Sequence, residues 1–319
     1  MTSNTSEQEV PIQPREESVT VLGRALTSVI SAGREILAKR RPFAETARGA
    51  TESLVALCTE LLDHRGEASG LALAQEITEA YKDLTSEQQL AFFKQLAEQF
   101  DTDRDAILEA ADRYRENSDL DHLLEITRTV EAPRQKLFRR INMAPDGTRT
   151  LVALRGDLLQ VLRANPELKA VDSDLKHLFI SWFNKGFLEL RSIDWSSPAN
   201  VLEKLIAYEA VHQINGWDDL RGRLRDDRRC FAFFHPAMDE DPVVFVEVAL
   251  TDTIPEAIAP LIDRNRKTIP AEKMNTVVFY SISNCHPGLA GISFGNFLIK
   301  NVVAQLNNAM EQHKTFVTL

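Results

Sequence analysis

The sequence predicts an α+β protein in two parts, an all-α N-terminal half followed by a half built on a central, mostly antiparallel sheet. Three observations predict this architecture. From Val19 to about Leu188, apolar residues recur at helical spacing, and no strand pattern interrupts them. Beyond Leu188, short runs of β-branched and aromatic residues alternate with helical segments. Finally, a strand, a glycine-spaced loop and an amphipathic helix follow one another between Val277 and Lys300.

Length and charge restrict the class of protein. The 319 residues, 44% of them hydrophobic, suffice for about two globular domains. A formal net charge of −10 argues against sequence-independent binding to nucleic acid, which needs clustered Lys and Arg. No apolar run approaches the roughly 20 residues that span a bilayer, and the polar, acidic start is neither a secretory signal nor an Arg-rich transit peptide. We therefore expect neither a nucleic-acid nor a membrane partner.

Cysteine usage points to a reducing compartment. Cys58, Cys230 and Cys285 lie far apart in the sequence, without a CxxC pair or the ligand spacing of a zinc site. The sequence therefore predicts neither a disulfide framework nor a metal centre, and a cytoplasmic location fits best.

The N-terminal half is expected to hold a disordered tail over residues 1–18 and a helical domain over residues 19–188. Apolar stripes such as Leu54, Leu57 and Leu61 predict about seven or eight helices, within the range of a bundle. Helix starts are indicated by Ser86-x-x-Gln89, a capping-box pattern, and by the acidic run 101–105 ahead of Ile107.

The second domain is expected over residues 189–319. Ser197-Pro198 reads as an N-cap followed by proline at the first position of a short helix. Strands are predicted at 230–234 and 243–250 with a hairpin loop between them, and a helix from Pro255 to Ile262. A third strand follows at 277–283, and Thr315–Leu319 has the composition of a strand that is just starting.

The most informative segment is the glycine loop, Pro287–Gly295, which lies between the third strand and a helix that begins near Phe294. Its glycines stand at intervals of three and four, where positive φ and close approach of a ligand are both permitted. Unpaired amides and the positive dipole end of the helix would favour an anion there. The loop fits neither the dinucleotide fingerprint nor the P-loop, and glycines that serve only packing and turning remain the alternative.

Other candidate residues favour structural roles. Cys285 and His286 are adjacent and cannot readily face one another, and no carboxylate is evident to orient the imidazole. His212 and His235 could reach a ligand, but satisfied structural histidines are the commoner case. Ser281 and Ser283 could contact a ligand or bond within the sheet. Five arginines interleave with four aspartates and favour a solvated ion-pair surface over a phosphate site: Arg221, Arg223, Arg225, Arg228 and Arg229.

At this point the residues carry a family likeness. The run Phe279-Tyr280-Ser281-Ile282-Ser283, followed by Gly288-Leu289-x-Gly291-x-x-x-Gly295-x-Phe297-Leu298-Ile299-Lys300, resembles malonyl-CoA decarboxylases. Further matching motifs stand in the same order: Trp195-x-Ser197-Pro198, Glu209-Ala210-Val211-His212, Trp217, Arg228-Arg229-Cys230, His235, Pro242-x-Val244 and Val248-Ala249-Leu250-Thr251. The likeness covers about Leu188 to Leu319 closely, whereas the helical half matches in character more than in motif.

The resemblance implies a helical oligomerisation domain followed by an acyl-CoA-binding domain similar to the GCN5-related acetyltransferases. In such folds the loop after a central strand holds the coenzyme A (CoA) diphosphate. This agrees with the amide and dipole argument for Ala290, Gly291, Ile292, Ser293, Phe294, Gly295 and Asn296. The implied reaction converts malonyl-CoA to acetyl-CoA and CO2, without a metal or a further cofactor, in a protein that self-associates through its helical domain.

The resemblance also implies where catalysis resides. The family's active serine lies in a Leu-Ser-Pro-x-Pro-Gly-Phe motif, and Phe316-Val317-Thr318-Leu319 corresponds to the run that leads up to that serine. The partner histidine of the family lies further along. We therefore assign no catalytic residue, and expect a truncated domain that binds CoA and is inactive. The alternatives are an acyl-CoA-dependent acyltransferase, and a non-catalytic module that binds CoA or oligomerises.

Overall fold

The computed structural model describes residues 21–40, 49–209, 211–263, 265–309 and 315–319. The expected disordered tail, residues 1–18, lies outside these segments. The described N-terminal part contains nine α-helices and one short 3-10 helix, somewhat more than the predicted number. They are α1 (Val21–Arg40), α2 (Ala50–Asp63), α3 (Glu67–Lys82), α4 (Ser86–Gln99), α5 (Arg104–Glu116), α6 (Leu120–Thr129), α7 (Pro133–Ile141), α8 (Gly147–Leu162), η1 (Pro166–Leu168) and α9 (Lys169–Trp182).

Helix starts follow local capping chemistry, with one shift of register. The Asp103 carboxylate accepts hydrogen bonds from the amides of Asp105 and Ala106 and caps α5, which confirms the acidic signal. The capping box of α4 is formed by Thr85 and Gln88 rather than by Ser86 and Gln89. The two pairs have the same spacing, so sequence alone did not distinguish them.

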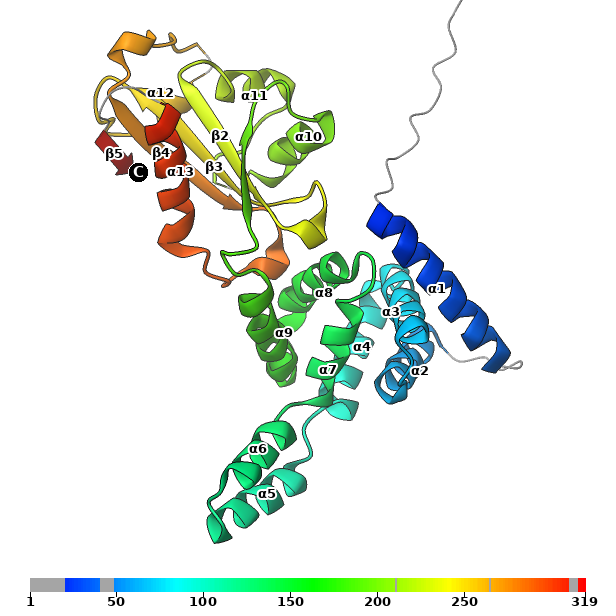
Figure 1. Ribbon diagram of the computed structural model, residues 1–319. Helices are drawn as coiled ribbons and strands as arrows, with labels where there is room; N and C mark the ends of the chain where they lie inside the picture. The colour runs from blue at the N-terminus through cyan, green and yellow to red at the C-terminus, as the bar shows by residue number, and fades with distance from the viewer. Residues whose placement is uncertain (1–20, 41–48, 210, 264, 310–314) are drawn as a thin grey trace, which may run out of the picture.

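Two arrangements stand out among the helices. Helices α2, α3, α4, α7, α8 and α9 share one apolar core, which includes Leu73, Phe93, Phe138 and Phe179. Helices α5 and α6 form an arm that projects away from this body (Figure 1), and α6 has no buried residue. No helix in the described part of the chain has the length and apolar character needed to cross a bilayer.

The C-terminal part is a five-stranded mixed sheet with helices on both faces. Its strands are β1 (Glu189–Ile193), β2 (Arg228–Phe234), β3 (Pro242–Thr251), β4 (Thr276–Asn284) and β5 (Thr315–Thr318), in the spatial order β1-β2-β3-β4-β5. All neighbours are antiparallel except β4 and β5. The remaining elements are α10 (Ala199–Tyr208), α11 (Trp217–Arg223), η2 (Pro236–Met238), α12 (Ala259–Ile262), η3 (Ala271–Lys273), η4 (Pro287–Leu289) and α13 (Gly295–Ala309). The predicted fold class, a helical part followed by a mixed, mostly antiparallel sheet, is confirmed.

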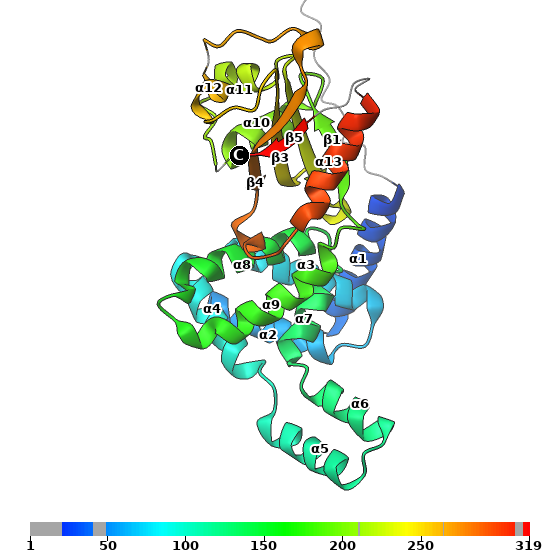
Figure 2. The same ribbon diagram turned by 90° about the vertical axis from the view of Figure 1, so that its left-hand side faces the viewer.

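Alternation along the strands divides the core between the two faces of the sheet. Phe231, Val246 and Phe279 belong to the core that includes Leu298, Val302 and Leu306 of α13. The opposite residues, among them Cys230 and Phe245, pack with Val201, Leu202 and Leu205 of α10 and with Leu220 of α11. Figures 1 and 2 show the sheet lying between α13 and the α10–α11 pair.

Several predicted elements differ from the observed ones. The helix expected from Pro255 is only α12, because Pro260 has no amide hydrogen and is tolerated only in a first turn. Helix α10 begins at Ala199, with Pro198 as its N-cap residue, and the Ser197 hydroxyl instead accepts a hydrogen bond from the Asp194 amide. Strand β1 and helix α11 were not predicted, since each is short and neither has a strong periodic pattern.

The glycine loop sits where the two parts meet. Helix α9 ends at Trp182 and β1 begins at Glu189, so only a short connection joins the parts. Helix α13 runs along the sheet with its N-terminal end directed toward α8 and α9 (Figures 1 and 2). The segment before α13 therefore rests on the helical part.

Candidate functional site

The glycine loop is a compact turn rather than an open run of free amides. The Ala290 amide donates to the carbonyl of Pro287, and the Ile292 amide donates to the carbonyl of Leu289, each at 3.0 Å. Gly291 between them has φ +74°, a conformation that favours glycine. Two of the seven residues predicted to bind a diphosphate therefore use their amides inside the loop.

Other amides of the loop are available. Within the described part of the chain, the amides of Gly291, Ser293 and Phe294 have no hydrogen-bond acceptor. The first four amides of an α-helix have no acceptor within the helix, and α13 begins directly after them at Gly295. A cluster of amide donors thus remains at the start of α13, without the amides of two of the seven predicted residues.

Arg155 of helix α8 holds the glycine loop by hydrogen bonds to its backbone. This guanidinium is only 2% exposed and donates from Nη1 to the carbonyls of Gly288 at 2.5 Å and Ala290 at 2.9 Å. Its Nε donates to Asp172 Oδ1 on α9 at 2.8 Å. In a trans peptide the carbonyl and the following amide point in opposite directions. Because the Ala290 carbonyl points toward Arg155, the Gly291 amide points away from it.

The backbone of the glycine loop also packs very closely against the backbone of α8. A Cβ atom on Gly288 would lie 1.8 Å from the carbonyl oxygen of Val152 and 3.0 Å from the amide nitrogen of Gly156. The loop therefore lies directly against the backbone of α8, and only glycine fits at this position. The alternative reading of the glycines, tight packing, is thus correct for Gly288, while Gly291 supplies the positive φ.

A cavity of about 440 Å³ opens beside the loop, between the two parts of the molecule. We call it the loop cavity. Its lining residues are Lys176, Ile180, Phe183, Asn184, Lys185, Leu188, Gly291, Ile292, Ser293 and Phe294. Four of the seven predicted site residues thus line one cavity. The other lining residues come from α9 and the connection to β1, which the sequence analysis did not associate with the loop.

The electrostatics of the loop cavity favour an anion. Lys176 Nζ lies 3.4 Å from the position of a Cβ on Gly291, so its ammonium group sits against the loop backbone. Lys185 Nζ lies 5.7 Å from the centroid of the Phe297 ring, on the first turn of α13. Two cations and the N-terminal end of a 15-residue helix therefore surround the same space.

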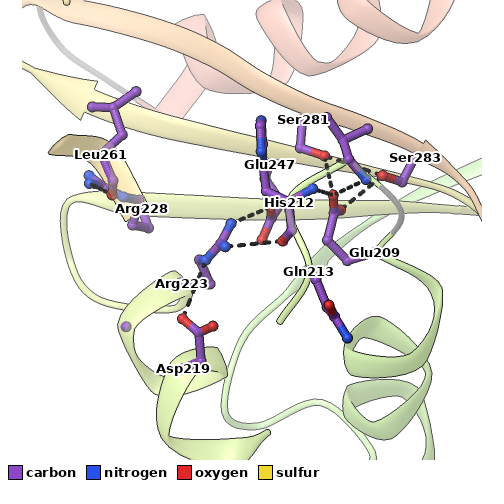
Figure 3. A network of polar contacts seen from close by, with 12 residues as sticks. Glu209, His212, Gln213, Asp219, Arg223, Arg228, Glu247, Leu261, Ser281 and Ser283 are labelled. Carbon is purple, nitrogen blue, oxygen red and sulfur yellow. Dashed lines mark hydrogen bonds and ion pairs between the residues drawn. The ribbon is translucent and has the colours of Figure 1, made fainter. Parts of the chain in front are cut away.

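A second polar cluster lies beneath α10 and α11 (Figure 3). The Glu209 carboxylate accepts hydrogen bonds from the hydroxyls of Ser281 at 2.7 Å and Ser283 at 3.0 Å. Its Oε1 also accepts from the amides of Val211 and His212. Both serines therefore bond to a carboxylate that follows α10, a partner that differs from both of the predicted alternatives.

A β-bulge brings the serines to this face. The register between β3 and β4 shifts at Glu247 and Val248, so Ser281 pairs with Glu247 while Phe279 pairs with Val248. Without the extra residue, Ser281 and Ser283 would continue the face of Val277 and Phe279, which packs on α13. The bulge thus turns two polar side chains away from the α13 core and toward Glu209.

The arginine cluster is only partly on the surface, contrary to the prediction. Arg223 and Arg228 are buried, together with Asp219 and Asp227. Arg223 Nη1 donates to Glu247 Oε2 at 3.0 Å, and burial raises the pKa of Glu247 to about 8. A charge run usually lies on a solvated face, but here alternation in β2 and the packing of α11 bury part of it.

Two of the three candidate histidines, His286 and His235, bond to backbone carbonyls, whereas Nε2 of His212 is buried without a hydrogen-bond partner in the described part of the chain. His286 Nε2 lies 3.0 Å from the Pro242 carbonyl oxygen, and the Asp241 carboxylate lies 3.8 Å away, although no such carboxylate was evident in the sequence. His235 Nε2 lies 3.1 Å from the Trp182 carbonyl oxygen. Cys285 is buried, which raises the pKa of its thiol. Neither histidine forms a nucleophile and base pair with this cysteine.

Fold and site together define a class of protein: a helical part joined to a mixed-sheet part, with a cationic cavity at a helix N-terminus between them. Family profiles match both parts in order, the malonyl-CoA decarboxylase N-terminal domain at residues 100–183 and its C-terminal domain at residues 186–319. The chain belongs to the malonyl-CoA decarboxylase family.

Solved structures and curated proteins agree. Malonyl-CoA decarboxylase from Rhodopseudomonas palustris superposes with a TM-score of 0.80 at 50% identity, over 85% of this chain and 66% of that one. The protein of the same name from Cupriavidus metallidurans gives 0.66 at 33% identity, over 85% and 62%. The mitochondrial malonyl-CoA decarboxylases of Anser anser anser and Rattus norvegicus are 37% and 35% identical over 220 residues, 67% of this chain. The chain thus spans less than half the length of these curated relatives, 44% and 45%.

Proposed function

We propose that the protein decarboxylates malonyl-CoA to acetyl-CoA and CO2, and that the residues around the loop cavity bind the CoA part of the substrate. The family membership of both parts supports the reaction. The observation that carries the binding role is the cluster of free amides at the start of α13, beside Lys176 and Lys185. No cofactor beyond the CoA of the substrate belongs to this proposal.

The chemistry divides into binding and catalysis. Loss of CO2 from a malonyl thioester leaves an enolate, which needs hydrogen-bond donors at its oxygen and a proton at its carbon. We assign only binding to the loop residues. Holding the phosphates at one end of a long thioester fixes the position of the acyl group at the other end, which lowers the entropy cost of reaching the transition state.

Release of CO2 tests the proposed reaction. With malonyl-CoA labelled in its free carboxyl group, we expect a protein that joins these residues to the family's serine motif to release labelled CO2 and one acetyl-CoA per CO2, without any acceptor amine, and the 319-residue chain alone to release none. Acylation of an added amine with release of CoA and no CO2, by transfer of the intact malonyl group from malonyl-CoA or of the acetyl group from added acetyl-CoA, would instead establish the acyltransferase alternative. Measured together, the two products separate these activities in one assay.

We further propose that the protein self-associates through the α5–α6 arm. Leu108, Leu120 and Val130 of this arm are 64%, 67% and 47% exposed, and the paired helices project from the body. A second copy of the chain would cover these side chains, since symmetric contacts between identical patches are the commonest way to form an oligomer. A cytoplasmic location remains a prediction from cysteine usage.

Replacing apolar residues of the arm with charged ones tests this proposal. Leu123 of the same arm is also exposed, at 44%. We expect Leu120→Lys combined with Leu123→Lys to raise the dissociation constant of the oligomer about 100-fold, because two apolar contacts are lost and two charges must be desolvated. Sedimentation velocity over a concentration series measures the change. Ile254→Lys, at another exposed apolar position outside the arm, is the control and should leave self-association unchanged. An unaltered sedimentation profile for the double variant would refute the arm interface.

A further inference from the structure

We propose that Lys176 and Lys185 form a phosphate subsite for the nucleotide half of CoA, so that the helical part supplies one wall of the substrate site. This inference rests on the proposed binding of a CoA thioester. It adds two binding residues that lie outside the strand, glycine loop and helix segment, and it gives the helical part a role in substrate recognition.

The positions of the two ammonium groups carry the inference. Lys176 is half-buried on α9, and its Nζ rests against the backbone at Gly291. Lys185 lies just after α9 and reaches over the ring of Phe297 in the first turn of α13. Both cations therefore flank the start of α13, where the free amides of the loop also lie.

Neither lysine is neutralised by a nearby carboxylate. Within the described segments, no ion pair involves Lys176 or Lys185, whereas the acidic residues of α9 are taken up by arginines. Asp172 pairs with Arg155 at 2.8 Å, and Asp174 pairs with Arg134 at 2.5 Å. Two positive charges thus face the cavity although the chain carries a formal net charge of −10. Such a local concentration of cations is what a polyphosphate ligand requires.

The rest of the lining suits the adenosine of the ligand. Ile180, Phe183 and Leu188 add apolar side chains to the lining of the cavity, and a volume of about 440 Å³ lies within the range of small-molecule sites. CoA carries a diphosphate and a ribose 3′-phosphate next to its adenine. A cavity lined by apolar side chains and two cations matches that half of the molecule better than it matches the pantetheine arm, which has no charge.

Calorimetry on the 319-residue chain tests the inference. The double variant Lys176→Ala, Lys185→Ala should bind CoA about 30-fold more weakly than the unaltered chain does. Its affinity for adenosine 3′-phosphate 5′-diphosphate should fall by a similar factor. Acetyl-pantetheine, which has no phosphate, should bind to both proteins with the same affinity. Lys169→Ala removes an exposed lysine at the start of the same helix, away from the cavity, and should bind CoA normally.

Two further measurements sharpen the result. Raising the salt concentration should weaken CoA binding less steeply in the double variant, because fewer ion pairs are screened. With 3′-dephospho-CoA as ligand, a smaller loss in the double variant would assign the lysines to the 3′-phosphate, and an equal loss would assign them to the diphosphate; both support the subsite.

Two outcomes contradict the inference in different ways. If the unaltered chain binds CoA and the double variant binds it equally well, the lysine subsite is wrong while the proposed function stands. If the unaltered chain binds neither CoA nor malonyl-CoA and a protein that joins it to the family's serine motif releases no CO2, the proposed function fails and the subsite fails with it.

Discussion

Replacing Gly288 with alanine is expected to lower the free energy of unfolding by about 3 kcal/mol or more and to abolish tight CoA binding. The added Cβ would lie 1.8 Å from the carbonyl oxygen of Val152 and 2.8 Å from its carbonyl carbon. Both atoms belong to the backbone of α8, so no side chain can rotate away. The glycine loop must lift from α8, which also breaks the hydrogen bonds from Arg155 to the carbonyls of Gly288 and Ala290.

A matched glycine provides the control. Gly70 lies in α3, and nothing lies within 4 Å of a Cβ atom placed there. Gly70→Ala should therefore leave CoA affinity unchanged and raise stability by about 0.5–1 kcal/mol, because alanine loses less backbone entropy in a helix. Chemical denaturation and calorimetry measure both variants. A Gly288→Ala protein with unaltered stability and affinity would show that the loop does not rest on α8.

The second large effect is expected for Arg223→Met, which should cost about 3–5 kcal/mol of stability at alkaline pH. Arg223 lies between two buried carboxylates, 3.0 Å from Glu247 and 3.7 Å from Asp219, and its Nη2 donates to the His212 carbonyl (Figure 3). Methionine fills part of the space but removes the donor to Glu247 and to the His212 carbonyl, whereas Asp219 keeps its hydrogen bond from the Asn215 amide. Arg221→Met, on the exposed side of the same helix, should cost less than about 1 kcal/mol.

The stability lost in Arg223→Met should be larger at high pH than at low pH. Burial raises the pKa of Glu247 to about 8, above its usual value, so the folded state binds this proton more tightly than the unfolded state does. Stability therefore falls as pH rises from about 4.5 through about 8. Removing the guanidinium raises this pKa further, so the Arg223→Met penalty should be smaller at pH near 6 than near 9. Thermal midpoints across that range test it, and an equal penalty at both ends would contradict the assignment.

Sequence patterns predicted the helices and strands better than the contacts between distant parts of the chain. The strand before the loop, the glycines and the helix that begins near Phe294 all follow from local composition, and these elements form as predicted. Arg155, Lys176 and Lys185 were missed because each lies on or beside a helix that reads as an ordinary amphipathic segment. Their relation to the loop is a contact between distant parts of the chain, for which a single sequence carries no signal.

The buried polar cluster shows a second limit. Strict alternation places Ser281 and Ser283 on one face of β4, but it cannot say which face once a bulge intervenes. Arg223 and Arg228 were misplaced for a different reason, because their charge suggested solvent exposure whereas both side chains are buried. Glu209 is the partner of the two serines, Glu247 is the partner of Arg223, and Arg228 donates to the Leu261 carbonyl, so these partners come from elsewhere in the fold.

Hydrogen exchange with and without CoA tests the central claim most directly, that a CoA thioester binds between the glycine loop and α9. With saturating CoA, the amides of residues 291–298 should exchange more slowly, and a smaller protection should extend over residues 176–185. Unchanged exchange in both segments, with protection elsewhere or nowhere, would contradict it.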